Sequence, residues 1–197
     1  MSQDSDPTHQ TLLAAVRAEV VAGGTSRTTV TSVAKRAGVS RMTVYRRTTG
    51  LEQLFRDALA QEFADAAQLS ATNGTVREQI VAQARQIVHR LRASELLRTL
   101  FRDEPALIAA YQRDQFGRGQ ALFADLLQDA IAEGQRDGSV CAGDPALLAR
   151  VLLMAVSPFV LAEPTVLGPP RESAPDDDAL DRELARLVDG YLRPDAS

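Results

Sequence analysis

Residues 29–47 constrain the fold more than any other stretch, because they combine start and stop signals for two short helices. Thr29 is a residue type that caps a helix N-terminus, and apolar residues follow it at helical spacing. Gly38 tolerates the positive φ that chain reversal requires. Ser40 provides a second cap. The stretch therefore predicts two helices joined by a tight turn, with Val39 buried beneath the corner.

The second predicted helix carries a cationic outer surface. Val44 and, on one interpretation, Tyr45 point inward. Two helices across a three- to four-residue turn that contains Gly, the second helix basic, are typical of a helix-turn-helix that enters a DNA groove. The residues expected on the outer faces are Arg41, Met42, Thr43, Arg46 and Arg47.

Charge is distributed unevenly along the chain. The net charge of −4 at first argues against a nucleic-acid partner. Residues 1–50, however, hold seven cations and three anions, a balance of +4, which leaves −8 on the remainder. This asymmetry is expected for a small DNA-binding module attached to an acidic body.

The run A-K-R-A-G-V-S-R-M-T-V-Y-R-R at residues 34–47 resembles the N-terminal DNA-binding domain of TetR-type bacterial repressors. Thr29-Val30 ahead of it and Leu51-Glu52-Gln53-Leu54 behind it extend the resemblance, which covers roughly residues 10 to 60. Family members commonly have an aromatic residue, then Pro and later Lys where this chain has Thr48, Thr49 and Leu51. A usual phosphate contact is thus missing, and we expect the adjacent arginines to compensate.

Different residues of the motif are expected to contact different parts of DNA. Arg41, Met42 and Thr43 occupy the first helical turn, which meets base edges in helix-turn-helix complexes. Tyr45 and Arg46 are better placed for phosphates, as is the Thr29 cap. The alternative is a solvated helix face in a domain that does not bind DNA. The predicted DNA-contacting residues, with Thr31 included from its place in the family motif, are Thr29, Thr31, Arg41, Met42, Thr43, Tyr45, Arg46 and Arg47.

The whole chain is predicted to be all-α. Apolar residues recur at helical spacing from a first helix that starts at Pro7 to a last one that includes Tyr191, and no run alternates with a period of two. In the long helix after Gly50, the apolar face contains one polar residue, Glu62. We predict a three-helix DNA-binding domain over residues 1–55 and a helical domain for effector binding and dimerisation over residues 56–197.

Two C-terminal helices are predicted to join two copies of the chain. Residues 147–161 are apolar on nearly every side, and such a helix is buried all round. The resemblance implies an intersubunit four-helix bundle, here formed by residues 145–162 and 177–193. The proline-rich stretch 163–178 is expected to be a loop. A homodimer is expected because one short recognition helix contacts few bases and specificity requires two half-sites.

The family resemblance also implies a pocket for an apolar or amphipathic small-molecule effector, which releases many members from DNA. Helical spacing alone indicates only a core, so each residue is either pocket lining or ordinary packing. The candidates are Phe63, Leu97, Phe101, Ile108, Tyr111, Phe116, Phe123 and Met154.

Other functional classes find little support in the sequence. His9, His89 and Cys141 form no metal-ligand spacing, and no phosphate loop or nucleophile elbow occurs, so neither a cofactor, a metal nor catalysis is expected. No signal sequence or membrane span is visible, which favours a cytoplasmic protein. We therefore predict a homodimeric repressor of a palindromic operator. The alternatives are a ligand-responsive activator, a helical enzyme or a protein-interaction scaffold.

Overall fold

The fold is helical throughout the described part of the chain. In the computed structural model the described residues are 7–68, 73–106, 109, 119–161 and 177–194, and none of them forms a strand. The predicted all-α fold class is confirmed. Among these residues, no helix combines the length and apolar content that crossing a bilayer requires.

The chain divides into two compact units. The first comprises Met1–Asp65 and Ala93–Gln115, and the second comprises Ala66–Arg92 and Phe116–Ser197. The contact-defined units thus place the segment after Ala93 with the N-terminal residues, whereas the predicted boundary lies at residue 55. Because compactness does not define a functional domain, the functional division remains a prediction.

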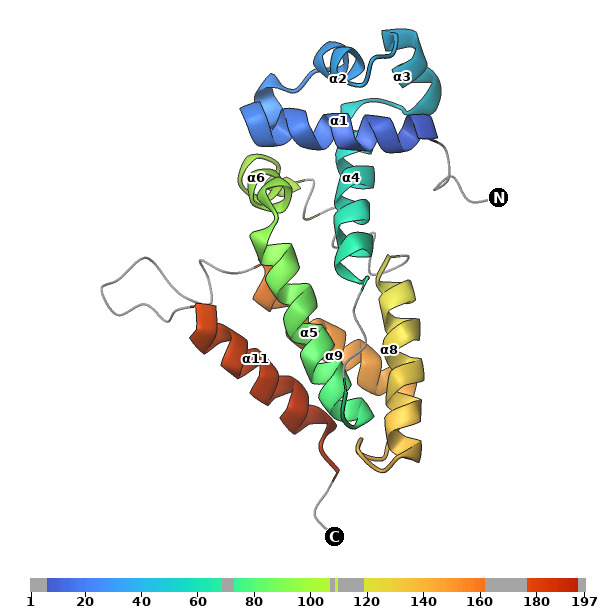
Figure 1. Cartoon of the computed structure of the whole chain (residues 1–197), viewed down its shortest axis with the longest axis vertical. Coiled ribbons are helices and arrows are strands. Elements are labelled where there is room, and N and C mark those ends of the chain that lie inside the picture. The colour runs from blue at the N-terminus through green and yellow to red at the C-terminus, as the bar shows by residue number, and fades with distance from the viewer. Residues whose placement is uncertain (1–6, 69–72, 107–108, 110–118, 162–176, 195–197) are drawn as a thin grey trace, which may run out of the picture. The chain divides into compact units, whose positions relative to one another are not determined.

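The first unit is built around its N-terminal helix, which packs against α2 (Val30–Arg36), the 3-10 helix η2 (Thr25–Arg27) and α6 (Glu95–Asp103). Leu12, Val16 and Val20 recur every four residues on one side of this helix, and all three are fully buried. Each such side chain contributes about 1.5–3 kcal/mol by leaving water. The elements of the unit, seen in Figure 1, are α1 (Pro7–Gly23), the 3-10 helix η2 (Thr25–Arg27), α2 (Val30–Arg36), α3 (Arg41–Arg47), α4 (Leu51–Ala66) and α6 (Glu95–Asp103).

Helix α6 belongs to this unit because its apolar residues are concentrated on one side. Ser94 caps the helix by accepting a hydrogen bond from the backbone N–H of Leu97 at 3.3 Å. Leu96, Leu97 and Leu100 are buried. The sequence predicted the helix but assigned it to the effector-binding body, because its spacing does not identify which neighbour covers its apolar face.

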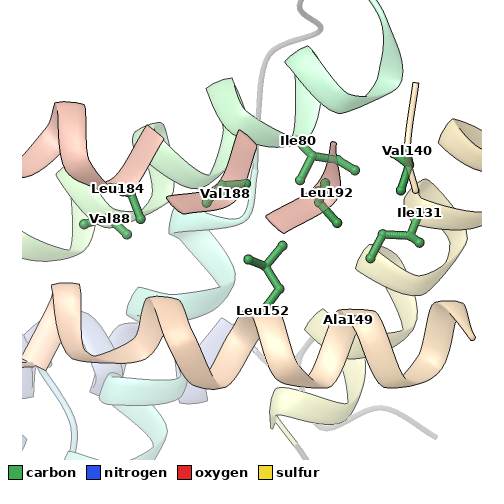
Figure 2. Packing of buried hydrophobic residues seen from close by; sticks show 9 residues of the cluster. All are labelled: Ile80, Val88, Ile131, Val140, Ala149, Leu152, Leu184, Val188 and Leu192. Atoms are coloured by element: carbon green, nitrogen blue, oxygen red, sulfur yellow. The ribbon is translucent and has the colours of Figure 1, made fainter. Parts of the chain in front are cut away.

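The helices of the second unit pack around a cluster of buried aliphatic side chains. Figure 2 shows Leu152 of one helix opposite Leu184 and Val188 of another. Ile80, Ile131 and neighbouring aliphatic residues extend the cluster. The helices that contribute to it are α5 (Val76–Ala93), α8 (Gly119–Arg136), α9 (Pro145–Leu161) and α11 (Asp177–Leu192).

Helix α9 is apolar apart from Arg150 and Ser157, and only one of its faces is buried within the chain. Ala149 and Leu152 lie in the core. On the opposite face Leu147, Val151 and Met154 are 59%, 39% and 61% exposed. The second unit covers only one side of this helix, so the predicted burial on all sides requires a second copy of the chain and remains a prediction.

Helix α11 has a charged outer face. Its inner side chains join the core, and two of its carboxylates pair with arginines of α5: Asp181 with Arg85 and Asp189 with Arg77. Outward, the helix carries exposed charged side chains. Among them are Arg182, Glu183 and Arg186.

Some residues named in the sequence predictions lie outside the described part of the chain. Residues 163–176 of the expected loop lie outside the described residues, as do Ile108, Tyr111 and Phe116. The expected loop was two residues too long, because α11 already begins at Asp177.

Candidate nucleic-acid interface

Helix α2 begins with a reciprocal capping box. The Thr29 hydroxyl accepts from the backbone N–H of Ser32, and the Ser32 hydroxyl accepts from the backbone N–H of Thr29, both at 3.0 Å. Just upstream, the buried Thr28 donates its hydroxyl to the carbonyl of Gly24 at 2.9 Å. The entry into the motif is thus fixed by short-range hydrogen bonds on both sides of the cap.

The turn between α2 and α3 is a Schellman motif. The N–H of Val39 donates to the carbonyl of Ala34 at 3.0 Å, and that of Gly38 donates to Lys35 at 3.3 Å. Gly38 has φ of +68°, which satisfies the predicted need for a left-handed residue. Val39, which was predicted to be buried beneath the corner, is half-buried.

Helix α3 is short and is anchored by one side chain. Ser40 caps it by accepting from the N–H of Thr43 at 3.1 Å. Val44 is fully buried, whereas Met42 and Tyr45 are 73% and 49% exposed. Tyr45 therefore does not point into the core, and its expected role at phosphates remains a prediction.

An ion pair ties α2 to α1. Arg36 Nε lies 2.5 Å from Glu19 Oε1, and this hydrogen bond holds the pKa of the Glu19 carboxyl below its ordinary value, with a further contribution from Ser32. The pair links the helix that precedes the turn to the helix at the base of the unit. With the buried Val33 and Val44, it fixes the orientation of the motif.

A second tie reaches the motif from α6. Asp103 Oδ2 accepts from the backbone N–H of Thr25 at 3.2 Å, at the start of η2. The hydrogen bond from Arg102 and then that from Thr25 lower the pKa of the Asp103 carboxyl. No local pattern indicated this contact, because its partners are 78 residues apart in the chain.

The structure places the predicted DNA-contacting residues on one short segment of chain. Thr29 and Thr31 lie exposed at the start of α2, and Thr43 is half-buried in α3. These positions bring polar, cationic and apolar side chains together, the mixture required for phosphate and base-edge contacts. The exposed members on α3 are Arg41, Met42, Tyr45, Arg46 and Arg47.

Comparison with known proteins agrees with this motif. The chain is 32% identical over 192 residues to an uncharacterised HTH-type transcriptional regulator of Mycobacterium tuberculosis, and the match covers 98% of both chains. A related HTH-type regulator of Mycobacterium bovis is 31% identical with the same coverage. No family model matches the chain.

Solved structures of TetR-type regulators share the fold. TylP, a TetR regulator from Streptomyces fradiae, superposes with a TM-score of 0.62 at 18% identity, over 98% of this chain and 89% of that one. The chain belongs to the TetR family. RolR, solved in complex with resorcinol, superposes with a TM-score of 0.67 at 15% identity, over 100% of this chain and 92% of that one. The mycobacterial relatives are transcriptional regulators and not enzymes.

Thr48, where this TetR-family chain departs from the common pattern, has a structural role. Its side chain is buried, and its hydroxyl donates to the carbonyl of Gly50 and accepts from the N–H of Gly50, both at 2.8 Å. The threonine thus braces the link from α3 to α4. This brace could have been predicted, because threonine hydroxyls commonly close turns on backbone groups two residues away.

The predicted effector-pocket residues of this TetR-family chain lie in both units. Phe63 and Phe101 are half-buried and Leu97 is fully buried in the first unit, and Phe123 is half-buried in the second. Met154 lies on the exposed face of α9, which favours a subunit interface over a pocket. The pocket as a whole remains a prediction. Within the described ranges, no three potential metal-ligating side chains are grouped to hold an ion.

Proposed function

We propose that this chain represses transcription by binding a palindromic operator through α3. The observation that carries the proposal is the contrast across this helix: Val44 is fully buried, whereas Arg41, Met42 and Arg46 are exposed on a helix that Ser40 caps. Arginine at the first turn can donate two hydrogen bonds to a guanine, and Met42 can contact a thymine methyl. Arg46 and Tyr45 then neutralise or hydrogen-bond phosphates.

The dimer in this proposal forms chiefly through α9. Leu147, Val151 and Met154 recur at helical spacing and present a continuous apolar stripe. A second copy of the same stripe, related by a twofold axis, covers it in this proposal. The charged outer face of α11 supports a place for the predicted segment 177–193 at the rim of the interface, where charges remain hydrated.

A small apolar or amphipathic effector is proposed to release the operator. RolR holds resorcinol in its solved structure, which supports a small molecule as the effector of this chain too. Such a ligand releases DNA if it binds more tightly to a dimer whose two α3 helices are spaced incorrectly for adjacent DNA grooves. It then shifts the population of dimers toward the form that does not bind the operator. We further propose that the protein acts in the cytoplasm.

A titration with two duplexes tests the proposed function. The wild type is expected to bind DNA from the intergenic region upstream of its own coding sequence more tightly than a random duplex of equal length. Replacement of Arg41, Arg46 and Arg47 by Ala should abolish this preference and leave the helical content unchanged, since all three side chains are exposed. Equal affinity of the wild type for the two duplexes would contradict operator binding.

A further inference from the structure

Helix α4 contains a buried carboxylate that DNA binding does not require. Glu62 is only 8% exposed, although the side chains around it on the same helix face are apolar. Leu59 is fully buried one turn before it and Ala66 is buried one turn after it. A buried carboxylate costs free energy unless it is paired, so its contacts define its role.

Glu62 joins three helices of the first unit. Its Oε1 lies 2.5 Å from the guanidinium of Arg17 on α1, and its Oε2 accepts a hydrogen bond from the Ser94 hydroxyl, also at 2.5 Å. The same hydroxyl is the N-cap acceptor of α6. A single carboxylate therefore connects α4 to α1 and to the first residue of the α6 segment.

The contact lies beside two points where the chain passes from one unit to the other. One passage follows Asp65, one turn beyond Glu62, and another precedes Ala93, directly before Ser94. The hydrogen bond from Ser94 to Glu62 thus ties together, within the first unit, the two chain segments that lead to the second.

Stability alone does not account for such a group. The Arg17 side chain is 51% exposed, so solvent screens its pair with Glu62 and the pair adds little to stability. Hydrogen bonds to a carboxylate, by contrast, impose direction. We propose that Glu62 is a positioning residue that holds α4, α1 and α6 together where the DNA-binding unit is attached to the rest of the chain. It thereby affects the distance between the α3 helices of the two subunits on the half-sites of an operator. This inference rests on the proposed function as a dimeric operator-binding protein.

The test compares operators whose two half-sites are separated by the natural distance or by one or two additional base pairs. The wild type is expected to bind the operator with the natural spacing about tenfold or more tightly than the operators with added base pairs. Glu62→Leu and Ser94→Ala should lose most of this preference and keep the wild-type affinity for random duplex. Ser94→Thr retains the hydroxyl and should restore the preference.

A matched control lies one turn along the same helix. Asp65 is exposed and accepts a hydrogen bond from Gln61 at 2.8 Å. Asp65→Asn removes a surface carboxylate and should keep the wild-type spacing preference, whereas Glu62→Gln should reduce it. Thermal unfolding followed by circular dichroism identifies variants that fail to fold. If Glu62→Leu does not fold, Ser94→Ala takes its place in the comparison, because this variant leaves the pair between Glu62 and Arg17 intact.

The outcomes separate the two proposals. A wild type that prefers no duplex over random DNA overturns the proposed function, and the positioning role is overturned with it. A wild type that prefers the natural spacing, together with folded Glu62→Leu and Ser94→Ala variants that prefer it equally, overturns the positioning role alone. Loss of the spacing preference in both variants with recovery in Ser94→Thr supports it.

Discussion

The outward faces of α3 and α9 both leave large side chains uncovered, but the residues beside those side chains differ. On α3, Met42 is 73% exposed among arginines. On α9, Met154 is 61% exposed in line with Leu147 and Val151, and one exposed cation, Arg150, lies beside them. An apolar group surrounded by cations suits a polyanion with apolar base edges, whereas an apolar stripe suits another apolar stripe. The residues beside an exposed methionine, more than its exposed fraction, therefore indicate whether DNA or a second copy of the chain covers it.

The largest effect is expected from a carboxylate placed in the α9 stripe. Met154→Asp would bury two unpaired charges across a twofold interface, and the dimer dissociation constant should rise at least about 100-fold. Sedimentation equilibrium measures this directly. Met42→Asp is the control, because it adds the same charge at a similarly exposed methionine on α3. It should remain dimeric yet lose DNA affinity through repulsion from phosphates, and a dimeric Met154→Asp protein would remove the distinction between the two faces.

The next effect concerns how α3 divides recognition between base edges and phosphates. Arg41→Ala should cost about 1–3 kcal/mol for the preferred operator and relax selectivity at one base pair. Arg46→Ala should weaken operator and random duplex alike and reduce the salt slope by about one. Titrations over a range of salt concentrations separate the two. Identical losses on both duplexes for Arg41→Ala would place this arginine at a phosphate instead.

The turn chemistry of the motif predicts a smaller effect, tested by the same substitution at two glycines. Gly38 has φ of +68° and no atom within 4 Å of an added Cβ, so Gly38→Ala should cost about 1–2 kcal/mol through backbone conformation alone. Gly190 lies within α11, and an added Cβ there also meets nothing within 4 Å. Gly190→Ala should stabilise by about 1 kcal/mol, since alanine favours helices. Urea unfolding measures both, and shifts of the same sign would contradict the assignment of the turn.

The smallest effect is pH dependence at the contact between α6 and η2. The pKa of Asp103 is lowered by hydrogen bonds from Arg102 and Thr25, so its ionised form is favoured in the folded state. This stabilisation is fully present above the ordinary value of about 3.9 and is lost as pH falls through the lower folded pKa. Asp103→Asn should therefore show a smaller loss of unfolding free energy below about pH 4 than the wild type does. Parallel acid-unfolding curves for the two proteins would refute this contribution.

The parts of the site that could be predicted are those held by neighbours along the chain. Thr29, Gly38 and Ser40 have the roles that the sequence indicated, because caps and left-handed turns depend on residues within a few positions. The start of α1 at Pro7 and the span of α9 followed from local signals for the same reason.

The parts that could not be predicted depend on distant partners. The sequence marked Glu62 as a polar residue on an apolar face, but its partners Arg17 and Ser94 are 45 and 32 positions away. The same holds for Asp103 and Thr25. Helical spacing identifies an apolar face without specifying the helix that covers it, so the association of α6 with α1 required the three-dimensional arrangement.

The most direct test of the central claim is selection of bound duplexes from a random pool by the purified wild-type protein. Enrichment of a palindrome is expected, with half-sites that lie one DNA turn, ~34–36 Å, or a multiple of it apart. Selection with Arg41→Ala should recover the same spacing with one base pair in each half-site relaxed. A final pool without enrichment, or with single half-sites only, would contradict a dimer that reads DNA through α3.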